Sequence, residues 1–213
     1  MKLVTEPYRE QVRRWPQKGR HILAQFDQDT IVVYQAYHPG IGQYAEKHNR
    51  FGEGFKLTRM SWIKTNFLWM MYRSGWGTKE NQEMVLAIWL KRDAFESILA
   101  NAVNSSYDPD QYASCEEWKQ AGMKSDVRLQ WDPDHDPLGN KVERRAIQLG
   151  LRGDTLMKYS DEWIVQIEDI SDFVAMQRSH AQNHEFDKLV VPKERPYLLH
   201  DPALKLKLGI GSY

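Results

Sequence analysis

Apolar residues that follow one another, or alternate with polar ones, predict the strands of this chain. The segment HILAQFDQDTIVVYQAY is rich in β-branched and aromatic residues on both sides of an Asp-Gln-Asp turn. It predicts a hairpin with strands at 21–26 and 30–37. The run MVLAIWL at 84–90 is apolar without interruption. Such a run is typical of a strand buried on both faces, so we expect it inside the sheet.

Apolar positions at intervals of three and four predict the helices. DAFESILANAV has an acidic first turn and one apolar side. TNFLWMMYRSG has Thr65 or Asn66 as its N-cap and Gly75 as its C-terminal stop. Weaker helical patterns occur in PGIGQYAEKHNRF and SDFVAMQRSHAQNH. VRLQW, followed by a turn-rich DPDHDPLGN, and EWIVQIEDI predict strands, whereas ERRAIQLGLRG fits either structure.

These patterns favour a single α+β domain. About six strands interleave with four or five helices without strict alternation, which favours a mixed sheet over a doubly wound parallel one. The 213 residues suffice for one sizeable core, and no repeat or low-complexity linker divides them. We expect a basic lead-in at 1–20, one domain at 21–190 and an irregular tail at 191–213.

The charge balance, the lengths of the apolar runs and the cysteine count limit the expected partners and cellular compartment of the protein. Lys and Arg total 29, as do Asp and Glu, so no net field draws the chain to nucleic acid or to an anionic membrane. No segment approaches the roughly 18 apolar residues needed to span a bilayer, and no membrane partner is expected. The single cysteine, Cys115, excludes an internal disulfide and fits a reducing compartment. We therefore expect a cytoplasmic protein, with the oligomeric state open.

The common catalytic motifs are absent. The sequence contains no G-x-G-x-x-G, no G-x-x-x-x-G-K-[ST] and no G-x-S-x-G, so it has no Rossmann fingerprint, P-loop or nucleophile elbow. His180 and His184 are spaced to share a metal, but the polar end of a surface helix explains them more simply. No metal site is predicted.

The most unusual stretch is RMSWIKTNFLWMMYRSGW, which places three Trp, two Arg and one Lys among apolar residues. Its start alternates like a strand, with Trp62 and Lys64 on one face and Arg59 and Ser61 on the other. Either the cations lie at the ends of core elements and reach water, or the stretch lines a pocket for a flat anion. The second interpretation also places phosphate at the N-terminus of the helix that follows Thr65.

Nine residues are candidates for ligand binding because aromatic rings can stack on a base and arginines match phosphate oxygens. Two of them, Tyr34 and Gln35, have a competing interpretation as a core aromatic beside an exposed amide on a strand. Of the adjacent arginines 144 and 145, one is expected to face solvent. The full set is Tyr34, Gln35, Arg59, Trp62, Lys64, Trp69, Arg73, Arg144 and Arg145.

Three blocks of the chain are similar to a known family: TIVVYQAYHPGIGQYA, RMSWIKTNFLWMMYRSGWGTKENQEMVLAI, and WDPDH followed by ERRAIQLGLRG. On these blocks the chain resembles bacterial and fungal proteins catalogued as domain of unknown function 4291, from about His21 to His184. The resemblance implies a single-domain protein found alone. One departure is Leu23, where the family pattern would have an arginine, so any role of that arginine is lost or moved here. No established activity accompanies the family.

Two classes of function fit these residues. An enzyme of the ADP-ribosyltransferase kind would use Arg59 or Lys64 for the pyrophosphate of NAD, an aromatic ring for stacking (Tyr34, Trp62 or Trp69), and Glu83 as the catalytic carboxylate. The alternative is a non-catalytic protein that binds single-stranded nucleic acid or a nucleotide in a basic-aromatic groove. A continuous basic stripe favours the groove, whereas a closed pocket with a carboxylate favours the enzyme. A purely structural, partner-binding protein stays open, and NAD is only a candidate cofactor.

Overall fold

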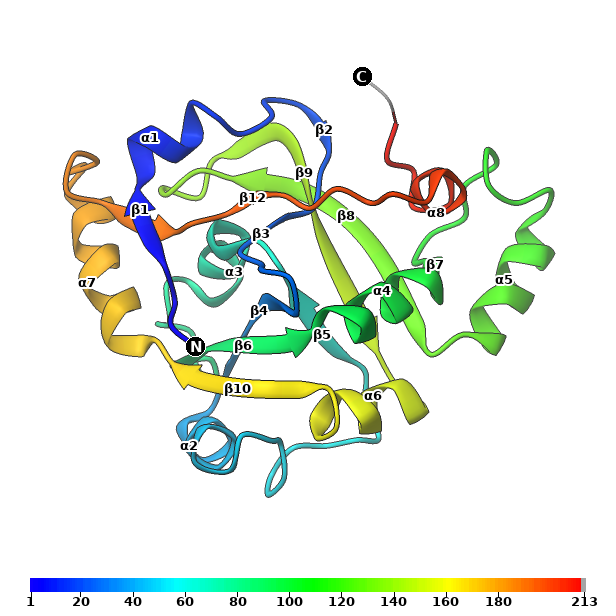
Figure 1. Ribbon diagram of the computed structural model, residues 1–213, viewed down its shortest axis with the longest axis horizontal. Coiled ribbons are helices and arrows are strands. Elements are labelled where there is room, and N and C mark those ends of the chain that lie inside the picture. Colours follow the sequence, from blue (N-terminus) through cyan, green and yellow to red (C-terminus); the bar gives the residue numbers. More distant parts are fainter. Residues whose placement is uncertain (212–213) are drawn as a thin grey trace.

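A mixed sheet of eight strands organises the molecule (Figure 1). The computed structural model describes residues 1–211. The strands of the sheet are β2 (Gly19–Arg20), β4 (Thr30–Tyr37), β5 (Ser61–Lys64), β6 (Met84–Lys91), β7 (Ala102–Asn104), β8 (Val127–His135), β9 (Lys141–Leu151) and β10 (Ile164–Asp169). Their order is β10-β6-β4-β5-β9-β8-β7, with β2 beside β9. Neighbours are antiparallel except β7 with β8 and β2 with β9.

Helices cover both faces of this sheet. They are α1 (Tyr8–Val12), α2 (Pro39–His48), α3 (Phe67–Ser74), α4 (Arg92–Ala100), α5 (Cys115–Lys124), α6 (Gly153–Ser160), α7 (Ser171–Gln182) and α8 (Pro202–Lys207). One core contains residues of α2, α4 and α6, and a second core on the opposite face contains residues of α3 and α7. The expected α+β class is confirmed. The described chain has eight helices and twelve strands, more of each than expected, because short pieces at both ends also pair.

Strand β6 joins the two cores. It lies between β10 and β4, and its residues contribute alternately to each core: Leu86, Ile88 and Leu90 to one, Val85 and Ala87 to the other. Both faces are therefore covered, as the uninterrupted apolar run predicts.

Helix α3 forms at its predicted position. The side chain of Asn66 accepts a hydrogen bond from the backbone N–H of Trp69 (2.8 Å), and Gly75 ends the helix in the left-handed conformation. Of the two proposed caps, Asn66 is the one used. The ambiguous segment at 143–153 is mainly strand β9, which pairs along most of β8. Strand β8 runs through Pro133 to His135, so the turn expected from Asp132 onward is shorter than its composition suggests.

The expected hairpin at 21–37 forms only in part. Phe26 and Ile31 make an isolated bridge, as a hairpin requires. Strand β3 (Leu23–Ala24), however, pairs with β12 (Arg195–Pro196) of the C-terminal segment. The C-terminal segment thus pairs with β3, where the sequence pattern predicts pairing with the strand at 30–37.

The two ends of the described chain lie against the sheet and against each other. Strand β1 (Thr5–Pro7) pairs with β11 (Val190–Pro192), and in Figure 1 the blue N-terminal segment lies beside the orange and red C-terminal one. Trp15 and Leu208 are buried, so both the basic lead-in and the tail contribute to the cores. The tail also forms α8, where an irregular path was expected.

No helix within residues 1–211 has both the length and the apolar surface required to cross a membrane.

Replacing Ala87 with Asp should prevent folding. Ala87 is fully buried in the middle of β6, and an unpaired carboxylate there costs several kcal/mol against a total stability of about 5–15 kcal/mol. The matched control is Ala175→Asp on the exposed side of α7, which should cost less than about 1 kcal/mol. The measurement is thermal unfolding of both variants. An Ala87→Asp protein that melts cooperatively near the wild-type temperature would contradict the buried position of β6.

Candidate functional site

The two halves of the sheet meet at a narrow junction. Strands β4 and β5 share one register pair, Tyr34 with Lys64, and beyond it they diverge. The side chain of Gln35 spans the divergence: its Nε2 donates to the carbonyl of Trp62 (3.0 Å) and to Ser61 Oγ (2.9 Å). The hydroxyl of Tyr159 donates to Gln35 Oε1 (2.6 Å) and fixes the orientation of the amide. A side chain therefore replaces part of the missing backbone ladder.

A cavity of about 500 Å³, here called the site pocket, opens where these strands separate. Its floor and walls come from the end of β4, the segment that enters β5, the second half of α3, the loop before β6, and strands β8 and β9. The lining residues are Gln35–Tyr37, Arg59–Trp62, Lys64, Met70, Arg73, Glu80–Gln82, Gln130 and Gln148. Of the ten residues singled out from the sequence, five meet here: Gln35, Arg59, Trp62, Lys64 and Arg73.

A second cavity of about 280 Å³ adjoins the site pocket. The two share Tyr37, Arg59, Ser61 and Asn81, and Lys56 adds a further cation to the second cavity. Tyr37 and Ser61 are joined by a hydrogen bond of 2.9 Å between their hydroxyl groups. The boundary between the cavities is therefore polar, with a cation beside two hydroxyls.

Lys64 is the buried cation of the site pocket. It is 4% exposed, and its Nζ lies 5.9 Å from the centre of the Trp69 ring. Within residues 1–211 its ammonium group makes no hydrogen bond or ion pair. Burial, with a smaller contribution from the nearby charge of Arg73, lowers the pKa of Lys64 to about 8, while Asp132 acts in the opposite direction. The stem of Lys64 is therefore buried, and the residue lines the site pocket.

Two arginines line the same cavity. Arg59 precedes β5 and is exposed, and Arg73 lies in the last turn of α3, also exposed. In the described part of the chain neither guanidinium has a hydrogen bond or an ion pair. Glu80 is the only carboxylate among the lining residues. The positive groups of the pocket thus outnumber its negative ones.

Cross-strand pairing sets the floor of the site pocket. Lys64 pairs with Gln148, and Gln148 pairs with Gln130, so the three side chains form a row on one face of the sheet. Asp132 fixes both amides, because its carboxylate accepts hydrogen bonds from Gln130 Nε2 (2.8 Å) and Gln148 Nε2 (2.7 Å). Because the two NH₂ groups are engaged, each amide keeps its oxygen available as an acceptor.

The three candidate stacking rings have different surroundings. Trp62 lines the site pocket and lies across from Gly150, where an added Cβ would be 2.5 Å from Met60 Sδ and 3.0 Å from Trp62 Cε2. The glycine leaves room for Met60 and Trp62 to lie over β9. Tyr34 is fully buried against Phe67, and Trp69 is packed beside Tyr72 and His135. Of the three rings, Trp62 is the one that reaches the cavity.

The remaining candidates lie outside the site pocket. Arg144 is buried, donates to Asp134 through Nε (2.8 Å) and to the carbonyl of Pro16 through Nη1 (2.7 Å), and lies over the Trp15 ring. It ties the lead-in to the sheet. Arg145 is exposed, so one member of the pair faces solvent, as expected. Glu83 is exposed and accepts from the backbone N–H of Asn81 (2.9 Å), which places it in the turn before β6.

The N-terminus of α3 already has a carboxyl group as its partner. The carboxyl group of Glu194 accepts a hydrogen bond from the backbone N–H of Phe67 (2.7 Å), and Glu194 is 4% exposed. The expectation of a phosphate at this helix terminus is therefore wrong, because a side chain from the C-terminal segment fills the position. Burial raises the pKa of Glu194 well above its ordinary range, and the nearby Asp134 adds to the effect.

Sequence patterns missed several groups at this site. Gln130, Gln148 and Asp132 lie on strands whose pairing was unknown, and Glu194 lies in a segment that looks irregular. One signal was present: the alternation of VRLQWDPDH places Gln130 and Asp132 on one face of a strand, and polar residues on a covered face of a sheet need a partner.

A family model now accounts for most of the chain. The model of the domain of unknown function DUF4291 matches residues 21–197 of the 213. The chain belongs to this family. The matched range includes every lining residue of the site pocket, as well as Glu194. No curated protein matches the chain. Within residues 1–211, no group of three or more His, Cys, Asp or Glu side chains is arranged to hold a metal ion.

Glu194→Gln should make the protein more stable at neutral pH, and the gain should disappear in acid. The folded chain keeps the Glu194 proton at pH values where the unfolded chain, with its ordinary pKa of 4.5, releases it. The unfolded state then binds fewer protons, so wild-type stability falls as the pH rises above about 4.5. A glutamine keeps the acceptor for Phe67 N–H and has no proton to release. We expect a gain of about 1 kcal/mol or more at pH 7.

Denaturant unfolding at a series of pH values tests this expectation. Asp134→Asn is the contrasting variant, because it leaves buried Arg144 without its carboxylate and should cost about 3–5 kcal/mol. If Glu194→Gln runs parallel to wild type from acid to neutral pH, Glu194 does not carry the pH dependence.

Proposed function

We propose that this chain binds a phosphate-bearing ligand of nucleotide size in the site pocket, with NAD as the first candidate. The observation that carries the proposal is Lys64, a buried ammonium group that has no counter-ion in the described chain and faces a cavity also lined by Arg59 and Arg73. A buried charge is costly unless it is paired. An anionic ligand would supply the missing partner.

The dimensions of the cavities support this ligand class. Ligand pockets commonly measure about 300–1,000 Å³, and the site pocket falls in that range at about 500 Å³. The adjoining cavity offers room for a second half of the ligand, with Arg59 at the boundary where a pyrophosphate would lie. Trp62 offers a ring for stacking, and Gln130 and Gln148 offer amide oxygens to hydroxyl or amino groups.

The proposed chemistry is transfer or hydrolysis at the ribose of such a nucleotide. That reaction needs a carboxylate to bond a ribose hydroxyl and to stabilise an oxocarbenium-like transition state. Glu83 accepts a hydrogen bond from the backbone N–H of Asn81 in the turn before β6, whereas Glu80, three residues earlier, lines the pocket. Glu80 is therefore the first carboxylate to replace in a test of activity. Free, exposed Cys115 fits a reducing compartment, and we propose the cytoplasm.

A groove for single-stranded nucleic acid is the competing proposal. Its strongest support is that three cations, Lys56, Arg59 and Arg73, line the two adjoining cavities. The deep position of Lys64 favours the nucleotide, because a polynucleotide backbone on the surface would not reach a side chain that is 4% exposed.

Replacing Lys64 or Arg59 with Met should weaken ligand binding without loss of stability. Each charged hydrogen bond lost costs about 1.5–3 kcal/mol, which is roughly ten- to a hundredfold or more in affinity. Lys64→Met also removes an unpaired buried charge, so the free energy of unfolding should stay level or rise. The measurement is calorimetry with NAD, ADP-ribose, ATP and a short oligonucleotide, together with thermal unfolding.

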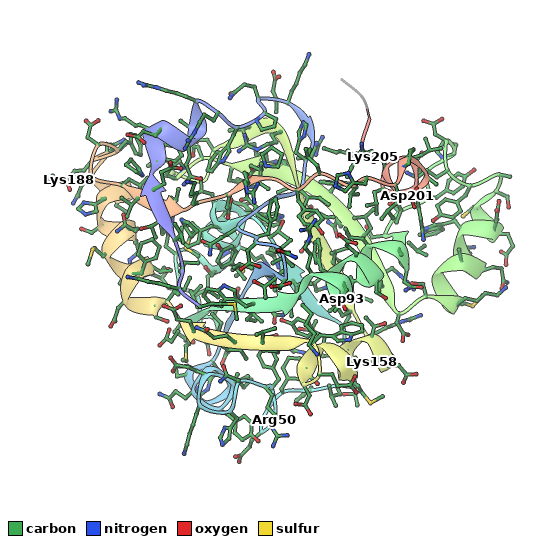
Figure 2. All side chains as sticks on the ribbon, viewed as in Figure 1. Arg50, Asp93, Lys158, Lys188, Asp201 and Lys205 are labelled. Atoms are coloured by element: carbon green, nitrogen blue, oxygen red, sulfur yellow. The ribbon has the colours of Figure 1, made fainter. Side chains whose placement is uncertain are left out.

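The matched controls are Lys158→Met and Arg50→Met, which remove the same charges at the periphery of the molecule (Figure 2). They should leave affinity unchanged. Equal affinity in wild type, Lys64→Met and Arg59→Met would show that Arg59 and Lys64 serve only the packing and surface of the protein and do not bind the ligand. Binding of the oligonucleotide alone would instead favour the groove.

Affinity for the anion should fall as the pH rises through about 8, because the Lys64 ammonium group loses its proton there. Lys64→Met should show no such step. The stability of the ligand-free protein should change in the opposite direction. Above about pH 8 the unfolded chain binds more protons at Lys64 than the folded chain does. The free energy of unfolding therefore rises with pH up to about 10.5. Titrations at pH values from about 7 to about 9.5 measure both effects. Identical profiles in wild type and Lys64→Met would contradict this assignment.

A further inference from the structure

We propose that Lys64 is a nucleophile that forms an imine with an aldehyde-bearing phosphate ligand held in the site pocket. The inference rests on the proposed function in one respect: it needs Arg59 and Arg73 to hold the anionic end of the ligand. It goes further in giving Lys64 a covalent role and in naming the chemical class of the ligand as a phosphorylated aldehyde or an open-chain sugar phosphate.

The surroundings of Lys64 distinguish it from every other lysine in residues 1–211. It is the only buried lysine there, and it lines a cavity large enough for a small ligand. Its neighbours in the sheet row are the neutral side chains of Tyr34 and Gln148, and Trp69 lies beside its ammonium group. A lysine in such a desolvated position releases its proton more readily and becomes a nucleophile.

The charged groups around Lys64 favour the neutral amine. Arg73 and Arg59 line the same cavity, and the charge of Arg73 acts together with burial to lower the pKa of Lys64 to about 8. Asp132 opposes this, but its carboxylate is engaged by Gln130 and Gln148. Exposed Glu80 is the carboxylate that lines the pocket. At mildly alkaline pH a substantial fraction of Lys64 is therefore unprotonated, unlike an ordinary lysine.

The covalent step balances without an additional reactant. The lone pair of neutral Nζ attacks the carbonyl carbon of the ligand, and the carbonyl oxygen takes up a proton to give a carbinolamine. Loss of the hydroxyl group with one further proton, as water, leaves a carbon–nitrogen double bond to Nζ. The net change is amine plus aldehyde to imine plus water, with no oxidation or reduction.

Borohydride trapping with pyridoxal 5′-phosphate tests the proposal, because this probe carries an aldehyde and a phosphate. The full-length chain is incubated with limiting probe near pH 8, reduced, digested and mapped by mass spectrometry. We expect the Lys64 peptide to be modified at least about tenfold faster than that of exposed Lys158, since burial lowers the pKa of Lys64 to about 8 and favours its neutral amine. Lys64→Arg should lose the fast phase and keep the slow background.

Two comparisons show whether the phosphate directs the probe. Pyridoxal, which lacks the phosphate, should modify Lys64 several-fold more slowly than the phosphorylated probe. Arg73→Met should reduce the faster rate to the pyridoxal level, and the peripheral change Arg50→Met should not. Modification of Lys64 at the rate of Lys158 in the wild-type chain would overturn the proposal.

The outcomes separate this inference from the proposed function. If NAD or ADP-ribose binds in calorimetry but Lys64 is not trapped, the covalent role fails and the nucleotide site stands. If Lys64 is trapped rapidly while no nucleotide binds, the nucleophile stands and the ligand is a smaller phosphorylated aldehyde. A competition experiment completes the test. Inorganic phosphate should slow the trapping of Lys64 in the wild-type chain and leave the slow background modification of Lys64→Arg unchanged.

Discussion

The single register pair between β4 and β5 is the constraint on which the site depends. Strands β10, β6 and β4 form one half of the sheet, and β9, β8 and β7 form the other, with four-residue β5 between them. Because β4 and β5 diverge after Tyr34 and Lys64, backbone groups at the divergence need other partners. Gln35 supplies them with its side chain. The same divergence opens the cavity, so the structural gap and the candidate site have one origin.

Charge is distributed unevenly along α3. Its N-terminus faces buried carboxyl groups, Glu194 directly and Asp134 through the Asn66 side chain. Arg73, in its last turn, lines the cation-rich pocket. The position of Arg73 agrees with the helix dipole, which favours positive groups at the last turn. At the first turn, Glu194 acts as a hydrogen-bond acceptor for a free backbone N–H, with a pKa that burial raises. In the described part of the chain, Asp134 has its own cation in Arg144, whereas the cations of the pocket have no ion-pair partner. That difference separates a structural ion cluster from a candidate binding site.

The ends of the chain support this arrangement from outside the central sheet. Gln11 accepts a hydrogen bond from the backbone N–H of Glu194 (2.8 Å), and Trp15 donates to the carbonyl of Glu194 (2.9 Å). The lead-in therefore fixes the C-terminal segment, and Glu194 in that segment caps α3. Two regions without a clear periodic pattern thus determine the orientation of the helix that carries Arg73.

Local patterns predicted what depends on local physics. The uninterrupted apolar run became β6, the Asn66 and Gly75 signals bounded α3, and five of the ten candidate residues meet at the site pocket. These features follow from periodicity, capping and the chemistry of single side chains, all of which are written in neighbouring residues. Only the tertiary structure decided that Lys64 shares a row with Gln148 and Gln130, that the tail displaces part of the expected hairpin, and that Glu194 occupies the helix N-terminus. Those contacts join residues that are far apart in the chain, and no local periodicity encodes which strand pairs with which.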